Sequence, residues 1–153
     1  MRITDTMDSH ARAIPDKAAI VSENEVVDYG SLSRMINRVA NALLGCKRLQ
    51  SEAKMDQGPE RQRKVAILLH HRAEFLQVFL GAAMAGWIAV PFDPKWSPVE
   101  MEETLLSCTP DVLVVDEDYT GRFRAIPAHV QTVIYREAGG RPLPLNATDF
   151  ASW

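Results

Sequence analysis

Short runs of apolar residues alternate along the chain with longer segments in which apolar residues recur every three or four positions. Continuous apolar runs of four or five residues are typical of strands buried on both faces of a sheet. Three such runs and one more mixed segment predict four strands, at residues 65–69, 87–90, 112–115 and 130–135. The mixed segment follows a weaker helix or loop that we expect over residues 117–128.

Between these runs, the helical period predicts helices over residues 29–45, 73–85 and 97–108. Their ends carry the expected signals, because Asp28 and Ser97 can each accept hydrogen bonds from the first amides of a helix. Gly86 follows the second helix and suits a left-handed C-terminal position. Strands that alternate with helices predict a parallel sheet with right-handed crossovers. The expected fold class is α/β, with a Rossmann-like, mostly parallel open sheet and flanking helices.

The remaining segments are less regular. Residues 3–14 have helical spacing, and residues 18–28 have the pattern of a hairpin. Residues 47–64 are polar and charged, which predicts an insertion or flexible loop. Residues 137–153 lack a period and are expected to form an irregular tail, although Leu143, Leu145, Phe150 and Trp153 could fold back over apolar surface. We expect residues 1–153 to form a single partial α/β domain.

Composition narrows the class of protein. The chain has 153 residues, of which 46% are hydrophobic and 24% are charged, the balance of a soluble globular domain. Its net charge of −3 gives no basic face, so nucleic acid is not an expected partner. The longest apolar stretch, residues 75–92, is broken by polar residues, glycines and a proline, and no membrane span or signal peptide is expected. Cys46 and Cys108 have no paired spacing, so we expect reduced thiols and a cytoplasmic location.

Polar side chains follow three of the predicted strands, at the edge where open parallel sheets tend to bind ligands. They are His70 and His71, Asp93 and Lys95, and the acidic run Asp116, Glu117 and Asp118. Adjacent histidines point in different directions and have no third ligand at metal spacing, so we expect a turn with a partly exposed imidazole. Asp93 lies between two prolines and is expected to close an Asx turn, and the acidic run is expected to be a solvated loop.

No phosphate-binding motif can be identified. The sequence contains neither G-x-x-x-x-G-K-[ST] nor a G-x-G-x-x-G after a strand. Gly81 and Gly86 flank an apolar helix end, where we expect close packing of the helix on the sheet. No nucleophile with a neighbouring base can be recognised either. The residues alone therefore predict a soluble α/β domain with no visible active site.

Three stretches nevertheless resemble the adenylate-forming superfamily, which comprises acyl-CoA synthetases, peptide-synthetase adenylation domains and luciferases. Residues 27–43 contain VDYGSL and NRVANAL, similar to the superfamily pattern (L/V)-(T/D)-Y-x-x-L followed by N-x-(L/V)-A-x-x-L. Residues 79–94, FLGAAMAGWIAVPFDP, are similar to its L-G-x-x-x-A-G-x-x-x-V-P-(L/I)-(D/N)-P motif. Residues 10–19, HARAIPDKAA, resemble H-A…P-D-K-x-A. The resemblance extends over about residues 8–116, and departs from the pattern at residues 47–64 and at His70-His71.

The resemblance implies a parent enzyme that activates a carboxylic acid with ATP to an acyl-adenylate and transfers the acyl group to CoA or a carrier-protein thiol. In that superfamily the phosphate loop, the magnesium and nucleotide motifs and a late lysine lie beyond the matching region. Residues 149–153, DFASW, resemble the stretch shortly before the phosphate loop. We therefore expect no catalytic, cofactor-binding or metal-binding residue in this chain, and no activity from the fragment itself. ATP, Mg and CoA are expected only in the full-length parent.

Two other interpretations remain open at this point. The chain could be a stand-alone α/β interaction or regulatory module without catalysis, or a different small nucleotide-binding α/β protein. For the leading interpretation, the expected partners are the remainder of the parent enzyme and a second copy of the chain, through exposed apolar surface. The reading frame after Trp153 distinguishes the ligase fragment from the stand-alone module, because the gene of a ligase would continue into a Ser/Thr/Gly-rich loop with lysine.

Overall fold

A computed structural model describes residues 3–23, 25–46, 62–137, 142–144 and 146–153. Contacts divide the chain into two compact units, which we describe separately. Unit 1 contains residues 1–46 and 71–86, and unit 2 contains residues 47–70 and 87–153. The single partial domain therefore stays a prediction. The expected insertion at residues 47–64 lies outside the described residues, except for its last three positions.

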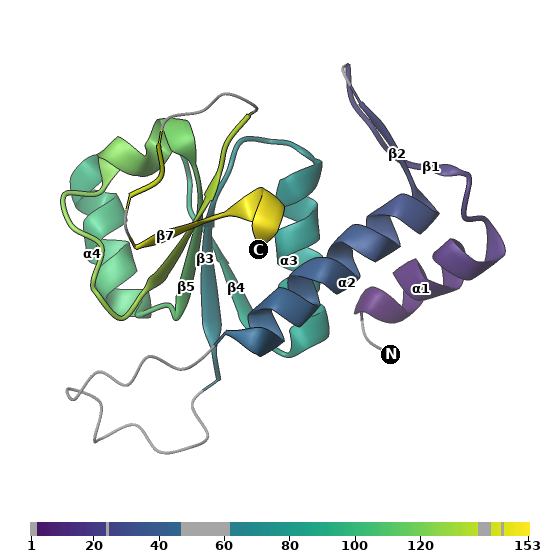
Figure 1. Cartoon of the computed structure of the whole chain (residues 1–153), viewed down its shortest axis with the longest axis horizontal. Coiled ribbons are helices and arrows are strands. Elements are labelled where there is room, and N and C mark those ends of the chain that lie inside the picture. Colours follow the sequence, from purple (N-terminus) through teal and green to yellow (C-terminus); the bar gives the residue numbers. More distant parts are fainter. Residues whose placement is uncertain (1–2, 24, 47–61, 138–141, 145) are drawn as a thin grey trace. The chain divides into compact units, whose positions relative to one another are not determined.

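The described residues of unit 1 form three helices and a hairpin. The helices are α1 (Ile3–Ala13), α2 (Tyr29–Gly45) and α3 (Ala73–Ala85), and β1 (Ala18–Val21) pairs antiparallel with β2 (Val26–Asp28) (Figure 1). The Asp28 carboxylate accepts a hydrogen bond from the Ser31 amide at 2.6 Å and caps α2 as predicted. Gly86 ends α3 with φ of 75°, the left-handed conformation that the sequence predicted for it.

The contact between α2 and α3 is unusually close at Gly81. A Cβ atom on Gly81 would lie 2.7 Å from Val39 Cγ1 and 3.2 Å from the carbonyl oxygen of Ile36. The sequence predicted close packing at this glycine, but between a helix and the sheet. The structure places it between two helices, because the small residues of α3 give a smooth face against which α2 can approach.

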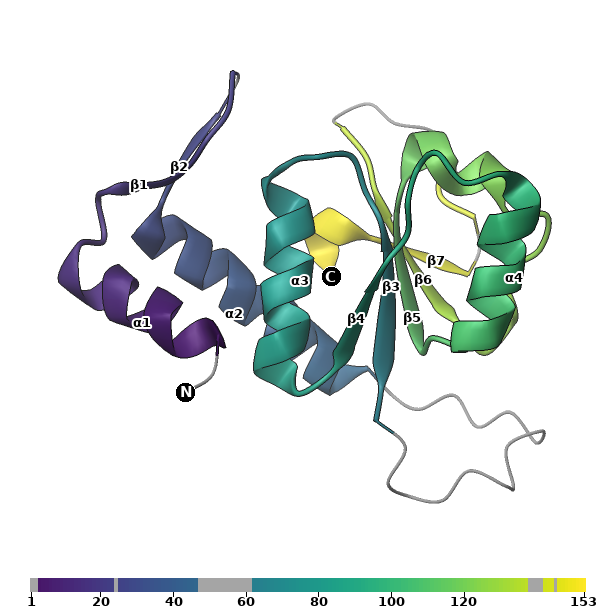
Figure 2. The same ribbon diagram turned by 180° about the vertical axis from the view of Figure 1, so that it is seen from behind.

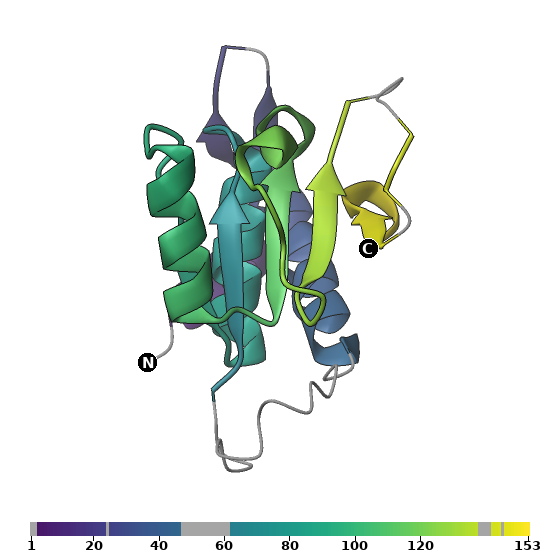
Figure 3. The same ribbon diagram turned by 90° about the vertical axis from the view of Figure 1, so that its left-hand side faces the viewer.

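Unit 2 contains a five-stranded sheet in the order β4-β3-β5-β6-β7, with every pair parallel (Figures 2 and 3). The strands are β3 (Lys64–Leu68), β4 (Ile88–Pro91), β5 (Val112–Asp116), β6 (Gln131–Tyr135) and β7 (Ala147–Asp149). All five residues of β5 are buried, as its unbroken apolar sequence predicted. The α/β fold and the parallel sheet are therefore confirmed.

Helix α4 (Pro98–Cys108) packs on the sheet of unit 2 through Met101 and Leu105, both almost fully buried. Its predicted capping box is present, because Ser97 Oγ accepts from the Glu100 amide while the Glu100 carboxylate accepts from the Ser97 amide. The region expected as a weak helix or loop begins with a 3₁₀ helix, η2 (Glu117–Arg122). Within the described residues, no helix is long and apolar enough to cross a membrane.

The tail that we expected to be irregular, residues 137–153, contains regular structure and corrects that prediction. Strand β7 adds to the sheet beside β6, and a short 3₁₀ helix, η3 (Phe150–Ser152), follows it. Three residues are too few to show a strand period, but Leu143 and Ala147 pack against the apolar core of unit 2 and hold the segment there. Leu145, which we also expected to cover apolar surface, lies outside the described residues.

An ion pair fixes the end of β7. Arg136 Nε donates to Asp149 Oδ2 at 2.7 Å, and Asp149 Oδ1 accepts from the Ala151 amide at 2.8 Å. The Ala151 amide and then the Arg136 guanidinium hold the pKa of Asp149 below its usual value of 3.8. Because the pKa is lower in the folded state, this carboxylate stabilises the fold above its unfolded pKa and loses that contribution as the pH falls through the folded pKa.

We predict that Asp149→Asn flattens the acid limb of the stability–pH profile below about pH 4. Arg136→Gln, which leaves the Ala151 hydrogen bond in place, should flatten it less. Chemical denaturation at successive pH values measures this effect. An acid limb of Asp149→Asn that superimposes on that of the unmodified chain would show that this carboxylate is not linked to folding.

Candidate functional site

Of the polar residues predicted at the carboxyl ends of the strands, His70, Asp116 and Asp118 meet in unit 2, whereas His71 belongs to unit 1 and Asp93 and Lys95 form a local turn. The register pairs Leu68 with Val115, so the residues that follow β3 and end β5 reach the same edge of the sheet. There the backbone amide of His70 donates to Asp116 Oδ2 at 2.5 Å. Asp116 is only 4% exposed, which corrects the expectation of a solvated loop at this position. Its carboxylate ties the two strand ends together.

The imidazole of His70 contacts η2. Its Nδ1 lies 2.9 Å from the hydroxyl oxygen of Tyr119, and the two rings are 4.5 Å apart between centroids. Its Nε2 lies 3.7 Å from Asp118 Oδ2, and the two side chains are 40% and 84% exposed. A pair this exposed contributes little to stability. The partly exposed imidazole agrees with the sequence prediction, whereas Tyr119 was not singled out.

A second contact holds the other end of η2. Arg122 Nη1 donates to the carbonyl oxygens of Pro94, at 2.5 Å, and Trp96, at 3.3 Å, in the loop after β4. The guanidinium carbon also lies 5.4 Å from the centre of the Tyr119 ring. The 3₁₀ helix therefore bridges segments that follow three strands of the sheet. Arg122 lies in an irregular segment with no motif, so no sequence signal pointed to it.

The loop after β4 is ordered by its own turn. Asp93 Oδ1 accepts from the Lys95 amide at 2.8 Å, which confirms the predicted Asx turn. Phe92 is buried in the apolar core and lies 5.4 Å from the ring of Trp96. The polar groups at this edge thus bind one another and the local backbone. The arrangement is a hydrogen-bonded junction between loops, and among the described residues no three His, Cys, Asp or Glu side chains are placed to hold a metal ion.

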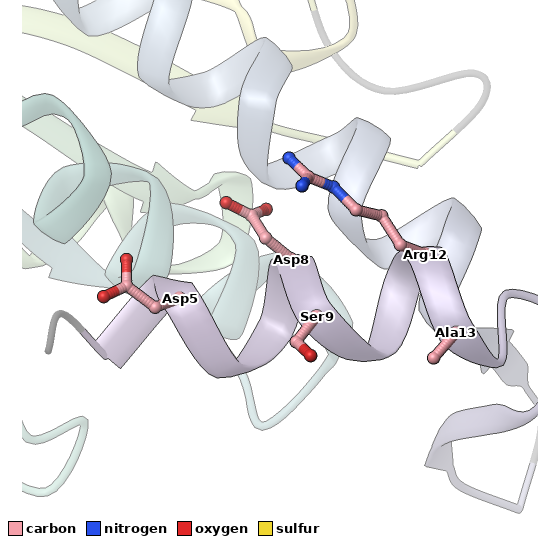
Figure 4. Close-up of a pocket in the computed structure, with 5 residues that line it drawn as sticks. All are labelled: Asp5, Asp8, Ser9, Arg12 and Ala13. Atoms are coloured by element: carbon pink, nitrogen blue, oxygen red, sulfur yellow. The ribbon is translucent and has the colours of Figure 1, made fainter.

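A separate hollow lies on unit 1, along α1 (Figure 4). It is lined by Asp5, Asp8, Ser9, Arg12 and Ala13. All five residues come from one helix, and the side chains of Asp8 and Arg12 project from the same side of it (Figure 4). A single exposed helix face supplies neither a nucleophile with a base nor a series of open backbone amides. We assign no chemistry to this hollow.

The fold defines an α/β protein built on an open parallel sheet. Residues 7–151 match the AMP-binding enzyme family, and the chain belongs to that family. This result confirms the resemblance to adenylate-forming ligases found in the sequence.

Individual relatives agree with this assignment. The chain is 39% identical over 114 residues to an uncharacterized acyl-CoA ligase, YhfT, of Bacillus subtilis, a match that covers 74% of this chain and 21% of YhfT. The chain therefore spans about a fifth of that relative's length.

Solved structures show the same fold. Coronafacic acid ligase from Pectobacterium brasiliense matches 98% of this chain with 28% of its own, at a TM-score of 0.79 and 14% identity. An O-succinylbenzoate CoA synthetase from Bacillus subtilis, in complex with AMP, matches 82% of this chain with 30% of its own. The TM-score of that match is 0.62 and the identity is 24%.

Proposed function

We propose that this chain is the N-terminal scaffold portion of an acyl-CoA synthetase-like ligase. The complete enzyme would activate a carboxylic acid with ATP to an acyl-adenylate and transfer the acyl group to a thiol. The observation that carries the proposal is the family match, which extends over residues 7–151 while the chain spans about a fifth of the relative YhfT. The name of that relative, an acyl-CoA ligase, supports the reaction class.

The proposed role of the chain is to support the active site of the complete ligase. Other parts of that enzyme would carry out adenylate formation and acyl transfer. ATP-dependent ligation depends on cationic groups and backbone amides that neutralise phosphate charge. At the sheet edge of unit 2, the His70 amide donates to Asp116 and the Arg122 guanidinium donates to two carbonyl oxygens. The carboxylates of Asp116 and Asp118 add negative charge there. These residues do not fit a triphosphate, so we propose that ATP, Mg and CoA are held by other parts of the complete ligase.

The proposed inactivity of the chain by itself can be tested directly. We expect no ATP–pyrophosphate exchange above background with a panel of carboxylic acids, and no saturable heat in a titration with Mg-ATP. Exchange by the chain alone, dependent on a carboxylic acid and abolished by removal of magnesium, would overturn this part of the proposal. Saturable ATP binding without exchange would instead favour a nucleotide-binding module.

We also propose that the chain resides in the cytoplasm and that its partner surfaces include exposed apolar side chains. Neither cysteine takes part in a disulfide in the described part of the chain, which supports a reducing compartment. In unit 1, Val21 and Val26 are directly opposite each other in the hairpin and are 71% and 66% exposed. In unit 2, Val99 and Leu106 of α4 are 50% and 57% exposed.

Self-association of the chain is the expected consequence, because exposed apolar patches and open strand edges promote pairing with other chains. Light scattering coupled to size exclusion should show a mass above that of the monomer that rises with concentration. Replacing Val21 and Val26 together by threonine keeps the β-branched shape and should lower the apparent mass, and Val99→Thr measures the separate contribution of the exposed surface of α4. A monomer over a wide concentration range would contradict the prediction.

A further inference from the structure

A methionine and a buried glutamine meet where α2 packs on α3 in unit 1. Gln77 Nε2 donates to the thioether sulfur of Met35 at 3.2 Å. Gln77 is 6% exposed, whereas Met35 is partly buried and packs at the margin of the apolar cluster of this unit. A thioether sulfur is a weak acceptor, so the nearly buried side-chain amide of Gln77 forms only a weak hydrogen bond. A stronger acceptor at the same place would improve the hydrogen bond.

Neighbouring contacts show that the two helices lie close together at this point. Gln77 and Gly81 are one turn apart on α3, and Met35 and Val39 are one turn apart on α2. Gly81 of α3 faces Val39 of α2. A Cβ atom on Gly81 would lie 2.9 Å from Val39 Cβ, so the two helix backbones are already in close approach. A polar atom added to Met35 therefore has to be accommodated by side chains within the existing spacing. The side chain that contacts the sulfur through a hydrogen bond, that of Gln77, is an amide donor.

We propose that Met35 is a site of reversible oxidation at which Gln77 binds the sulfoxide. A peroxide transfers one oxygen atom to the Met35 sulfur, the O–O bond breaks, and water is released, so the thioether is oxidised and the peroxide is reduced. Methionine sulfoxides disrupt cores because a polar group replaces an apolar one, and they are reversed by methionine sulfoxide reductases. At Met35 the new S–O oxygen is an acceptor within reach of the Gln77 amide. Met35 sulfoxide is therefore tolerated in the fold.

The same cluster supplies internal comparators. Met7 and Met84 also pack partly buried against it, and no hydrogen bond reaches either sulfur among the described residues. Oxidation at these positions adds a polar oxygen to a sulfur at which the described residues form no hydrogen bond. Met101, in unit 2, is fully buried and reports whether the oxidant has unfolded the chain. Peptide mapping by mass spectrometry distinguishes the four positions.

The test treats the chain with limiting hydrogen peroxide and then measures thermal unfolding of the oxidised and reduced forms. Four proteins are compared: the unmodified chain, Met35→Leu, Gln77→Leu and the double variant. For each residue at position 77, the Tm loss on oxidation of the protein with Met35→Leu is subtracted from that of the protein that retains Met35. The difference is the effect of oxidation at Met35. We expect that loss to be several degrees larger in the Gln77→Leu background than with Gln77 present, and treatment with a methionine sulfoxide reductase should restore the original Tm.

Equal Tm losses with and without Gln77 would overturn the proposal, as would mapping that finds Met7 or Met84 oxidised while Met35 stays reduced. If Gln77→Leu does not fold, the side-chain amide of Gln77 in the unmodified chain gives an independent readout by ¹⁵N NMR. Its proton resonances should move downfield when Met35 is oxidised, because the acceptor becomes stronger. An unchanged amide resonance in a chain with mapped Met35 sulfoxide would also refute the proposal.

Discussion

Gly81→Ala is expected to destabilise unit 1 although alanine is the better helix former. The added Cβ would lie 2.7 Å from Val39 Cγ1, 2.9 Å from Val39 Cβ and 3.2 Å from the Ile36 carbonyl oxygen. The last two atoms belong to the backbone of α2 or are fixed to it, so the helices must move apart. Overpacking of this kind costs about 1–3 kcal/mol, more than the gain of about 1 kcal/mol from helix propensity. Chemical denaturation measures the net loss.

Gly45→Ala is the matched control, because a Cβ at Gly45 meets nothing within 4 Å. It should leave the free energy of unfolding unchanged or raise it by up to about 1 kcal/mol. Val39→Ala in the Gly81→Ala background removes the nearest clashing atom and should recover part of the loss, a coupling that a double-mutant cycle isolates. A Gly81→Ala chain as stable as the unmodified one would show that α2 and α3 are not in close contact.

Asp116→Ala is the second substitution expected to have a large effect. It removes the buried carboxylate that accepts the His70 amide after β3, and leaves that donor without its partner at a partly buried position. An unsatisfied buried donor costs about 1–3 kcal/mol. Asp116→Asn retains an acceptor oxygen and should lose less. Urea denaturation of both variants, monitored by tryptophan fluorescence, gives the two values.

Asp118→Ala is the control for this pair of strands, because its side chain is 84% exposed and contacts the same histidine at 3.7 Å. Its effect should stay within about 0.5 kcal/mol, as is usual for substitutions of exposed residues. If Asp118→Ala destabilised the chain as much as Asp116→Ala, the stabilising contact at this edge would be the surface pair, and the buried amide–carboxylate bond would not hold the strand ends.

The helices and the central strands could be predicted because each carries its own signal in consecutive residues. Ser97, Pro98 and Glu100 mark the start of α4 by local hydrogen bonds, and the run at β5 is apolar because both of its faces are covered. Strand β7 could not be found in this way. Its three residues gain their place from pairing with β6 and from the Arg136–Asp149 ion pair, which joins positions 13 residues apart.

The junction at the sheet edge was only partly predictable for a similar reason. His70 and Asp116 stood out because they follow strands, but their 46-residue separation hides the hydrogen bond that buries Asp116. Tyr119 and Arg122 belong to a 3₁₀ segment whose sequence has no period, and their partners are a side chain and backbone carbonyls elsewhere in the chain. Contacts that depend on tertiary placement leave no pattern in neighbouring residues.

Replacement of the matching segment of YhfT by this chain tests the scaffold proposal most directly. The chimera is assayed for acyl-adenylate formation by hydroxylamine trapping over a panel of carboxylic acids, beside intact YhfT and a chimera that carries Gly81→Ala. We predict that the chimera folds and forms adenylates from the same acids as intact YhfT, and that the Gly81→Ala chimera has reduced thermal stability. A folded chimera that forms no adenylate, beside an active YhfT, would contradict the proposal.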